Sequence, residues 1–373
     1  MPEKVLAALK TAASTTELRE LDLPTMPSDA ALMKVEVAGV CGTDVSQYKL
    51  PLRAGPLIMG HENVGYLARV GTEFARRQAM KEGDLMFLEH YLPCGHCEWD
   101  RIGEYRHCAA TEWFYDPNAI RYGYTSTDIP PSLWGGFSHY LYLPINAVLH
   151  TVPAGLTPEE AGLATPMSNG IQWALIDGGV GFGSSVLIQG PGQQGLCCVM
   201  ASKHAGAGTV IITGTAKDAR RLQVAKALGA DVAVDIDADD PLARIQDVTN
   251  GRGVDVVIDC TVGAGPAPTI LGIEAAKRRG ATMVVQAEGH QTFPDFPIGR
   301  LTRKGITLKS ARGHSYRSVE MALQLLASKR FPLELITTHR FGLNQVDYAI
   351  KSVGGQGAPG AIHVSVMPWN GTR

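Results

Sequence analysis

The hydrophobic residues follow one pattern in the first part of the chain and another in its middle. Up to about residue 150, short alternating segments such as 32–37 are interrupted by glycine and proline, which is typical of short strands joined by turns. After a predicted helix start at 158–160, short fully apolar segments alternate with helical stretches, a pattern typical of a parallel sheet buried on both faces. Strands are expected at residues 186–188, 210–212, 232–234, 256–258 and 283–285. We therefore predict a doubly wound α/β domain preceded by a β-rich domain.

Beyond about residue 297 the chain returns to mixed segments, with a helix expected over 318–328 and a strand over 361–366. A length of 373 residues favours two domains, at about 150 residues per domain. Because the two ends share one pattern, we expect residues 1–155 and 298–373 to form one split catalytic domain. Residues 156–297 then form an inserted nucleotide-binding domain.

The composition excludes several classes of function. Hydrophobic residues make up 45% of the chain and charged residues 19%, so disorder is not expected over most of its length. The 34 lysine and arginine residues nearly balance the 36 aspartate and glutamate residues, which leaves a net charge of −2 and no broad basic surface for nucleic acid. No apolar run approaches the ~20 residues of a membrane span, and residues 1–16 lack a signal-peptide pattern. We expect a cytoplasmic protein that binds neither nucleic acid nor a membrane.

A glycine-rich loop lies between the first apolar strand and the helix after it. Its sequence is Gly190-Pro191-Gly192-Gln193-Gln194-Gly195, followed by Leu196. The first glycine of such a loop permits a tight turn, the second lets the backbone approach a pyrophosphate, and the third allows close helix packing. An isolated loop of this kind can be a turn without a ligand, but the strand-loop-helix setting favours a dinucleotide site. The helix that starts near Gln193 would direct its amides at the phosphates.

The choice between NAD and NADP depends on the end of the second strand, Thr213-Gly214-Thr215. An acidic residue normally binds the ribose hydroxyls of NAD at this position, and none is present. The cations that follow, Lys217, Arg220 and Arg221, could pair with a 2′-phosphate, which favours NADP. They could equally be the solvated face of the next helix, so both cofactors stay open.

Two groups of residues have the spacing of metal ligands. The first is Cys94, Cys97, Asp100 and Cys108, a compact set with no open coordination position, which is typical of a structural zinc site. Two alternatives are a redox pair of cysteines, and a surface Asp100 in a site that has lost its metal.

The second group joins Cys41 to His61 and Glu62, which together can hold zinc with one position left for water or substrate. The sequence does not fit a zinc protease, because Gly65 occupies the position at which the His-Glu-x-x-His motif of these enzymes needs its second histidine. The three remaining cysteines lie in the predicted nucleotide-binding domain and are interpreted as packing residues.

Over essentially its whole length the chain resembles the zinc-containing medium-chain alcohol dehydrogenase family. The family signature Gly-His-Glu-x2-Gly-x5-Gly matches from Gly60 through Gly71 and departs only at Phe74, where a smaller residue is usual. The resemblance implies a Rossmann sheet plus a β-rich GroES-like catalytic domain. It also implies one catalytic and one structural zinc, and a homodimer or homotetramer.

By this resemblance Cys41 and His61 are catalytic zinc ligands, and Glu62 is a ligand or a neighbour that exchanges with water. Asp44 would orient His61. Thr43 would hydrogen-bond the substrate oxygen and pass its proton on, aided by Ser46. The implied reaction is the reversible oxidation of a primary or secondary alcohol to an aldehyde or ketone.

The sequence departs from the family pattern at three further positions. Thr165 stands where relatives often supply a further zinc ligand, and Asp100 stands where a cysteine is usual. Ser46 replaces a histidine that carries the proton in many relatives.

Several aromatic residues fall in the segment that lines the substrate cleft in relatives. They are Trp113, Phe114, Tyr115, Tyr122, Trp134 and Phe137, with His90 as a further candidate. Aromatic residues more often pack in a core, but if these line the cleft, a bulky or aromatic alcohol is favoured.

Two other functions compete with alcohol dehydrogenation. One is a zinc-free NADPH-dependent enone or quinone reductase of the same superfamily, which would need neither metal group. The other is a non-catalytic nucleotide-binding or structural protein.

Overall fold

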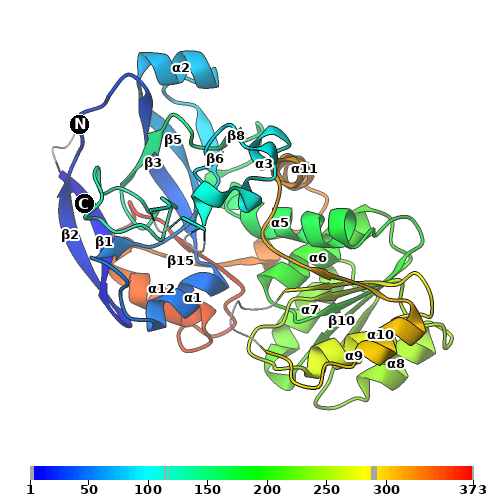
Figure 1. The fold of residues 1–373 in the computed structure, drawn as a ribbon. Coiled ribbons are helices and arrows are strands. Elements are labelled where there is room, and N and C mark those ends of the chain that lie inside the picture. Colours follow the sequence, from blue (N-terminus) through cyan, green and yellow to red (C-terminus); the bar gives the residue numbers. More distant parts are fainter. Residues whose placement is uncertain (1–3, 113–114, 117, 287–291, 372–373) are drawn as a thin grey trace. The chain divides into compact units, whose positions relative to one another are not determined.

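The computed structural model describes residues 4–112, 115–116, 118–286 and 292–371. Its contacts divide the chain into two compact units. The first unit comprises residues 1–165, 323–329 and 337–373, and the second comprises residues 166–322 and 330–336. The first is rich in antiparallel strands and the second is an α/β unit (Figure 1).

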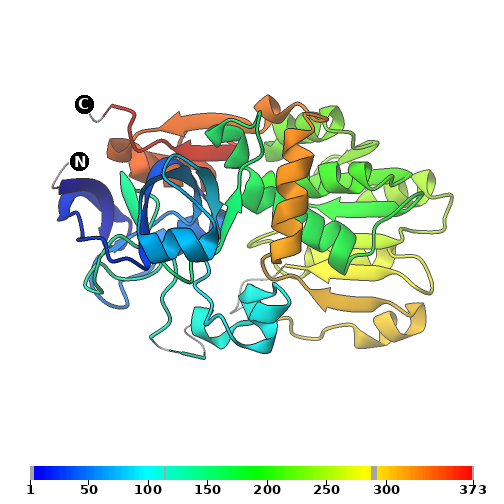
Figure 2. The ribbon, with the colours of Figure 1, turned by 90° about the horizontal axis from the view of Figure 1, so that it is seen from above.

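Two sheets form the first unit. A seven-stranded sheet has the order β15 (Thr337–Phe341), β16 (His363–Val366), β3 (Ala30–Gly39), β5 (Glu62–Val70), β6 (Leu85–Leu88) and β8 (Leu149–Thr151), with β7 (Tyr140–Pro144) also paired to β3. A three-stranded sheet has the order β2 (Thr15–Asp22), β1 (Lys4–Ala12) and β4 (Leu57–Ile58). Figure 2 shows β15 and β16 side by side, the one parallel pair of this unit among the described strands. The alternating segment at 32–37 lies within β3, which is buried over most of its length.

Short helices connect these strands and place the candidate site residues. They are α1 (Gly42–Lys49), α2 (Thr72–Gln78), α3 (Glu98–Arg101), α4 (Pro158–Ala161) and α12 (Val346–Val353), with 3₁₀ turns at Tyr105–His107 and Ala109–Thr111. The predicted start of α4 is accurate because Thr157 accepts a hydrogen bond from the Glu160 amide, while the Glu160 carboxylate accepts one from the Thr157 amide. The buried apolar residues of this unit pack largely into one hydrophobic core.

A six-stranded parallel sheet forms the centre of the second unit. Its order is β11 (Val232–Asp235), β10 (Thr209–Gly214), β9 (Ser185–Gln189), β12 (Val256–Asp259), β13 (Thr282–Val285) and β14 (Thr307–Ser310). The predicted doubly wound sheet and its five apolar strands are confirmed. The sixth strand, β14, escaped prediction because all four of its residues are exposed at the sheet edge. Since β14 pairs with β13, residues 298–322 pack with this unit, beyond the expected boundary at 298.

Helices cover both faces of this sheet. Those in contact with it are α6 (Gln193–His204), α7 (Ala219–Ala227), α8 (Pro241–Val248), α9 (Ala267–Ala275) and a π-helix at Gln172–Asp177. The unit also contains α10 (Ile298–Lys304), while α5 (Ala164–Ile171) and α11 (Tyr316–Ala327) each have residues in both units. Helix α6 packs on β9 and β10, and α8 and α9 lie on the other side of the sheet (Figure 1). Cys197 and Cys198 are fully buried on α6, in agreement with a packing role. In the part of the chain that the structure describes, no helix is long and apolar enough to cross a membrane.

Candidate active site

The pairing of β3 with β5 brings Cys41, His61 and Glu62 together. Gly39, the last residue of β3, pairs with Glu62, the first residue of β5. Cys41 follows two residues later as the cap of α1, so its thiol lies beside the start of β5. One ligand atom from each of the three residues lies within 4.8 Å of the others. A thiolate, an imidazole and a carboxylate at this spacing form a donor set that suits zinc.

Two glycines make this close approach possible. A Cβ on Gly39 would lie 2.5 Å from Oε2 of Glu62, so the Glu62 carboxylate would have to move from its present position. Gly60 has a φ of +86°, in the left-handed region that favours glycine, and a Cβ there would meet the Phe137 ring at 2.6 Å. Glycine at both positions therefore lets His61 and Glu62 lie next to the end of β3.

Asp44 fixes the orientation of His61. Its Oδ1 lies 3.3 Å from Nδ1 of His61, and its Oδ2 accepts a hydrogen bond of 2.9 Å from the Cys41 amide. Both side chains are buried. Because Nδ1 faces the carboxylate, Nε2 is the ring atom that faces Thr43 and the site. A carboxylate on the outer nitrogen is the usual partner of a metal-binding histidine.

The electrostatics of the group also fit a bound cation. Burial raises the pKa of Glu62 to about 7, although the charge of His61 opposes this shift. Burial alone lowers the pKa of His61, but the influence of Tyr124 and Asp44 raises it well above its usual range. Neither carboxylate oxygen of Glu62 has a hydrogen-bond partner of normal geometry among the described residues, and the Cys41 thiol approaches this carboxylate. A buried acid without partners is costly, and a divalent cation would compensate it.

Thr43 presents an exposed hydroxyl beside this group. Its Oγ1 lies 3.3 Å from Nε2 of His61 and accepts a hydrogen bond of 3.2 Å from the Tyr124 hydroxyl. Tyr124 was not among the aromatic residues that the sequence indicated. No sequence motif marks Tyr124, because its place beside His61 depends on the turn at Gly123, which has a φ of +80° in the structure.

Ser46 and Thr165 are two of the positions at which the sequence analysis expects a departure from the family pattern. Ser46 is exposed on α1, one turn after Thr43 and on the same face of the helix. Thr165 is buried near the start of α5, so it offers a neutral hydroxyl there.

Most of the aromatic residues proposed for the substrate cleft lie elsewhere. Trp134 is buried in the core and its Nε1 donates a hydrogen bond of 2.8 Å to the Ile129 carbonyl. Tyr122 and Phe137 are also fully buried, and Tyr115 is exposed. Trp113 and Phe114 lie outside the described residues. His90 is close to the site, with its ring centroid 5.4 Å from that of His61.

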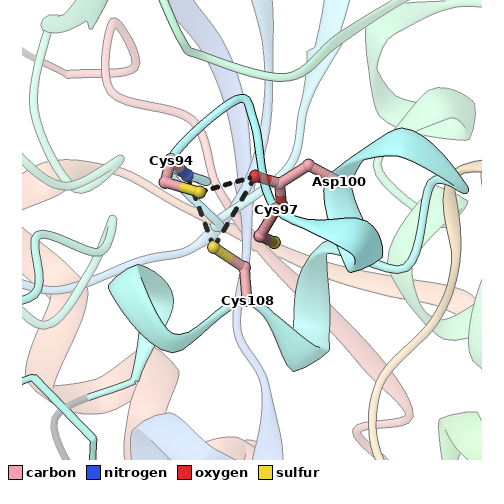
Figure 3. A group of neighbouring side chains, drawn as sticks. All are labelled: Cys94, Cys97, Asp100 and Cys108. Carbon is pink, nitrogen blue, oxygen red and sulfur yellow. Dashed lines mark hydrogen bonds between the residues drawn. The ribbon is translucent and has the colours of Figure 1, made fainter.

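The second group of ligands converges in the loop around α3. Figure 3 shows the side chains of Cys94, Cys97, Asp100 and Cys108 directed at one point. Oδ2 of Asp100 accepts hydrogen bonds from the Cys94 thiol at 3.0 Å and from the Gly95 amide at 2.7 Å. The Cys108 thiol donates to the same oxygen at 3.8 Å. Asp100 therefore lies among the thiols, where its carboxylate accepts hydrogen bonds from two of them and from a backbone amide.

Burial and hydrogen bonding shift the acidities of two residues in this group. Burial is the main reason that the pKa of the Cys108 thiol rises to about 12. Burial also opposes ionisation of Asp100, but hydrogen bonds from the three thiols outweigh it and lower the pKa of this carboxyl. Zinc prefers thiolates and binds carboxylates, so the group fits a closed structural zinc site.

The glycine loop of the second unit has the expected conformation. Gly190 has a φ of +91°, and Gly192 caps the N-terminus of α6. A Cβ on Gly195 would lie 2.0 Å from the Gly190 carbonyl oxygen, whereas a Cβ on Gly192 would meet no atom within 4 Å. The space beside Gly192 is thus available to a ligand. Leu196 is fully buried and anchors α6, and the partly buried Gln194 has an Oε1 without a hydrogen-bond partner among the described residues.

Two carboxylates next to the end of β10 accept hydrogen bonds from the turn that follows it, and one of them is Asp237, which accepts from the Ala216 amide at 2.9 Å. Asp218 accepts hydrogen bonds from the Thr215 amide and hydroxyl and forms an ion pair of 3.3 Å with Arg221. Gly214 packs against the loop, since a Cβ there would lie 2.7 Å from Pro191. Two further cations, Lys217 and Arg220, are exposed.

Comparison with known proteins agrees with this geometry. A family model described as "Alcohol dehydrogenase GroES-like domain" matches residues 27–154, and one described as "Zinc-binding dehydrogenase" matches residues 195–328. An alcohol dehydrogenase structure from Thermotoga maritima shares the fold, with a TM-score of 0.85, 23% identity, and coverage of 98% of this chain and 99% of that one.

Relatives of higher identity cover nearly the whole chain. A probable alcohol dehydrogenase of Mycobacterium tuberculosis is 35% identical over 356 residues, which are 94% of this chain and 95% of that protein. The sorbitol dehydrogenase of Bacillus subtilis is 31% identical over 357 residues, 94% of each. The resemblance seen in the sequence is confirmed, and the chain belongs to the zinc-type medium-chain dehydrogenase family.

Proposed function

We propose that the protein is a zinc-dependent, NAD(P)-linked alcohol dehydrogenase that interconverts a primary or secondary alcohol with its aldehyde or ketone. The observation that carries the proposal is the convergence of Cys41, His61 and Glu62 beside the exposed Thr43. Three such ligands leave one position of a tetrahedral zinc for a substrate oxygen. The relatives named as alcohol and sorbitol dehydrogenases support a hydroxyl group as the reacting group.

Each residue of the site has a distinct part in this reaction. Zinc held there would supply a Lewis acid for the substrate oxygen, and the nicotinamide would accept the hydride. Asp44 holds His61 with Nε2 facing the site. Thr43 can exchange a proton with the substrate oxygen and donate a hydrogen bond to it as negative charge develops there, because a hydroxyl is both donor and acceptor. Ser46, on the same exposed face of α1, can carry the proton onward with water.

For the cofactor, the proposal leans to NADP. The short residues at the end of β10 leave room for a 2′-phosphate, and the Asp218 carboxylate is already engaged by Thr215 and Arg221. Lys217 and Arg220 are exposed and can approach a phosphate. Titration of the protein with NADPH and with NADH, followed by nicotinamide fluorescence, decides between them.

For the substrate, the proposal stays broad. The aromatic groups next to His61 are His90 and Tyr124, which line one side of the site. They favour a substrate with an apolar or aromatic part over a small polyol. A panel that contains benzyl alcohol, short alkanols and sorbitol tests this preference.

The decisive test of the function follows the absorbance of reduced nicotinamide with this panel and both cofactors. Alcohol-dependent reduction of NADP or NAD supports the proposal. Turnover only with enones or quinones, in a chain that holds no zinc, would instead support the zinc-free reductase. Tight cofactor binding without turnover of any substrate would support a non-catalytic role.

A further inference from the structure

We propose that Tyr124 is a positioning residue of the reaction, which directs the Thr43 hydroxyl toward the substrate oxygen. This inference rests on the proposed function, because it concerns the group that contacts the substrate. Tyr124 is 81 residues beyond Thr43 in the chain, yet its hydroxyl donates a hydrogen bond of 3.2 Å to Thr43 Oγ1. Its ring also lies 5.3 Å from that of His61, so it contacts two residues of the site.

The backbone holds Tyr124 in this place. Gly123 packs against the segment that precedes β5, since a Cβ there would lie 3.0 Å from the Cβ of His61 and 3.1 Å from the Gly60 carbonyl oxygen. The Gly123 amide donates to the Trp134 carbonyl at 2.6 Å, and the Tyr124 amide donates to Arg121 at 3.2 Å. Hydrogen bonds from the backbone amides of Gly123 and Tyr124 therefore hold the turn in place.

A cation holds the ring of Tyr124 as well. The Arg121 guanidinium lies 4.7 Å from the centroid of this ring and 5.1 Å from that of Tyr91. Arg121 is itself near the Glu112 carboxylate at 3.7 Å. With the ring held between Arg121 and His61, the hydroxyl has little freedom to leave Thr43.

The direction of the hydrogen bond explains what Tyr124 does. A threonine hydroxyl has one hydrogen, and when its oxygen accepts from Tyr124 that hydrogen must point elsewhere. In this structure Nε2 of His61 lies 3.3 Å from Thr43 Oγ1. When Nε2 serves as a metal ligand, its lone pair is used in that bond and it carries no proton, so the Thr43 hydrogen is available to the substrate oxygen. Accepting a hydrogen bond also makes Thr43 a stronger donor, so the benefit increases as negative charge develops on that oxygen.

The test is Tyr124→Phe, which removes one hydroxyl and keeps the ring against Arg121 and His61. We expect kcat to fall about three- to tenfold, the loss of one hydrogen bond, while KM and cofactor affinity change little. In the background of Thr43→Ala, Tyr124→Phe should have no further effect. Tyr66→Phe is the matched control, because Tyr66 lies exposed on the same strand as Glu62 and should leave kcat unchanged.

A binding measurement gives a readout that is independent of turnover. Trifluoroethanol resists hydride loss but is more acidic than ordinary alcohols, so its hydroxyl proton is readily lost. Its Kd in the presence of oxidised cofactor therefore reports the hydrogen bond from Thr43 to an oxygen that carries negative charge. We expect this Kd to rise about three- to tenfold in Tyr124→Phe and to stay constant in Tyr66→Phe, with equal zinc content and Tm in both.

The outcomes separate this inference from the proposed function. Wild-type kcat and Kd in Tyr124→Phe, or an undiminished effect of Tyr124→Phe in the Thr43→Ala background, would overturn the role of Tyr124 alone. If the wild-type protein binds no zinc and oxidises no alcohol, the proposed function is wrong, and this inference is wrong with it.

Discussion

Asp44 and His61 form a buried pair in which Oδ1 of the carboxylate lies 3.3 Å from Nδ1 of the imidazole. The other carboxylate oxygen accepts a hydrogen bond from the amide of Cys41, so one side chain orders two candidate zinc ligands. The local sequence explains why one carboxylate contacts both residues, because Cys41 caps α1 and Asp44 occupies the third position of that helix. The pair leads to the first prediction.

Replacing Asp44 with asparagine should weaken zinc binding at this site. The asparagine oxygen can still accept from Cys41, but its amide group would then face the N–H of His61, donor against donor. Loss of such an outer partner typically costs about 10–100-fold in metal affinity or activity. Zinc retention during dialysis against chelators of increasing strength measures the effect, with Asp22→Asn, an exposed carboxylate, as the control. Unchanged retention in Asp44→Asn would contradict the orienting role.

Asp100 is expected to act as a zinc ligand in the second group. Asp100→Asn removes the charge while keeping an oxygen for the Gly95 amide, and should cost the chain about one zinc ion of the two that its ligand groups accommodate. The Tm should fall, by about 2–4 °C for each kcal/mol of stability lost. Asp100→Cys is the matched rescue, because a fourth thiolate completes a common zinc ligand set. Full zinc content in Asp100→Asn would show that Asp100 is only a hydrogen-bond acceptor.

Two substitutions in the glycine loop should both weaken cofactor binding, but only one of them should lower the Tm. Gly192 has a φ of −69° and open space beside it, so Gly192→Ala should fold normally yet block the approach of a pyrophosphate. We expect the Kd for reduced nicotinamide cofactor to rise at least about tenfold, or about 1.4 kcal/mol. Gly195→Ala should lower both the Tm and cofactor affinity, since its Cβ would collide with the Gly190 carbonyl. Normal cofactor binding by a folded Gly192→Ala would place the pyrophosphate elsewhere.

Thr43→Ala should lower turnover far more than cofactor affinity. The hydroxyl is exposed and bridges Tyr124 and His61, so its removal affects the substrate oxygen rather than the fold. A fall in kcat on the order of 100-fold is expected for loss of a group that handles the proton. Steady-state kinetics and cofactor titration measure the two effects, and Thr43→Ser should restore most of kcat. Equal losses in kcat and cofactor affinity would contradict the assigned role.

The buried parallel sheet was predictable because its central strands are apolar on both faces. Val186, Val210 and Val256 lie side by side in register, as expected for strands covered by helices. Strand β14 differs in that its residues, including Thr307 and Lys309, are exposed at the sheet edge. Its pairing depends on backbone hydrogen bonds to β13 rather than on burial, and a hydrophobic pattern does not carry that information.

The site was predictable only as far as its ligands follow one another at characteristic spacings. Cys41, His61 and Glu62 could be found from their types and from the family signature around them. Tyr124 could not, because its position depends on how the turn at Gly123 packs onto Gly60 and His61. Trp134 shows the converse, since an aromatic residue in the expected segment is buried in the core.

The dependence of alcohol oxidation on zinc tests the central claim most directly. Turnover of an accepted alcohol is measured in the chain as purified, after zinc has been removed with a chelator, and after zinc has been returned. The account predicts that turnover is lost with the metal and restored with it. Undiminished turnover in a chain shown to contain no zinc would contradict it.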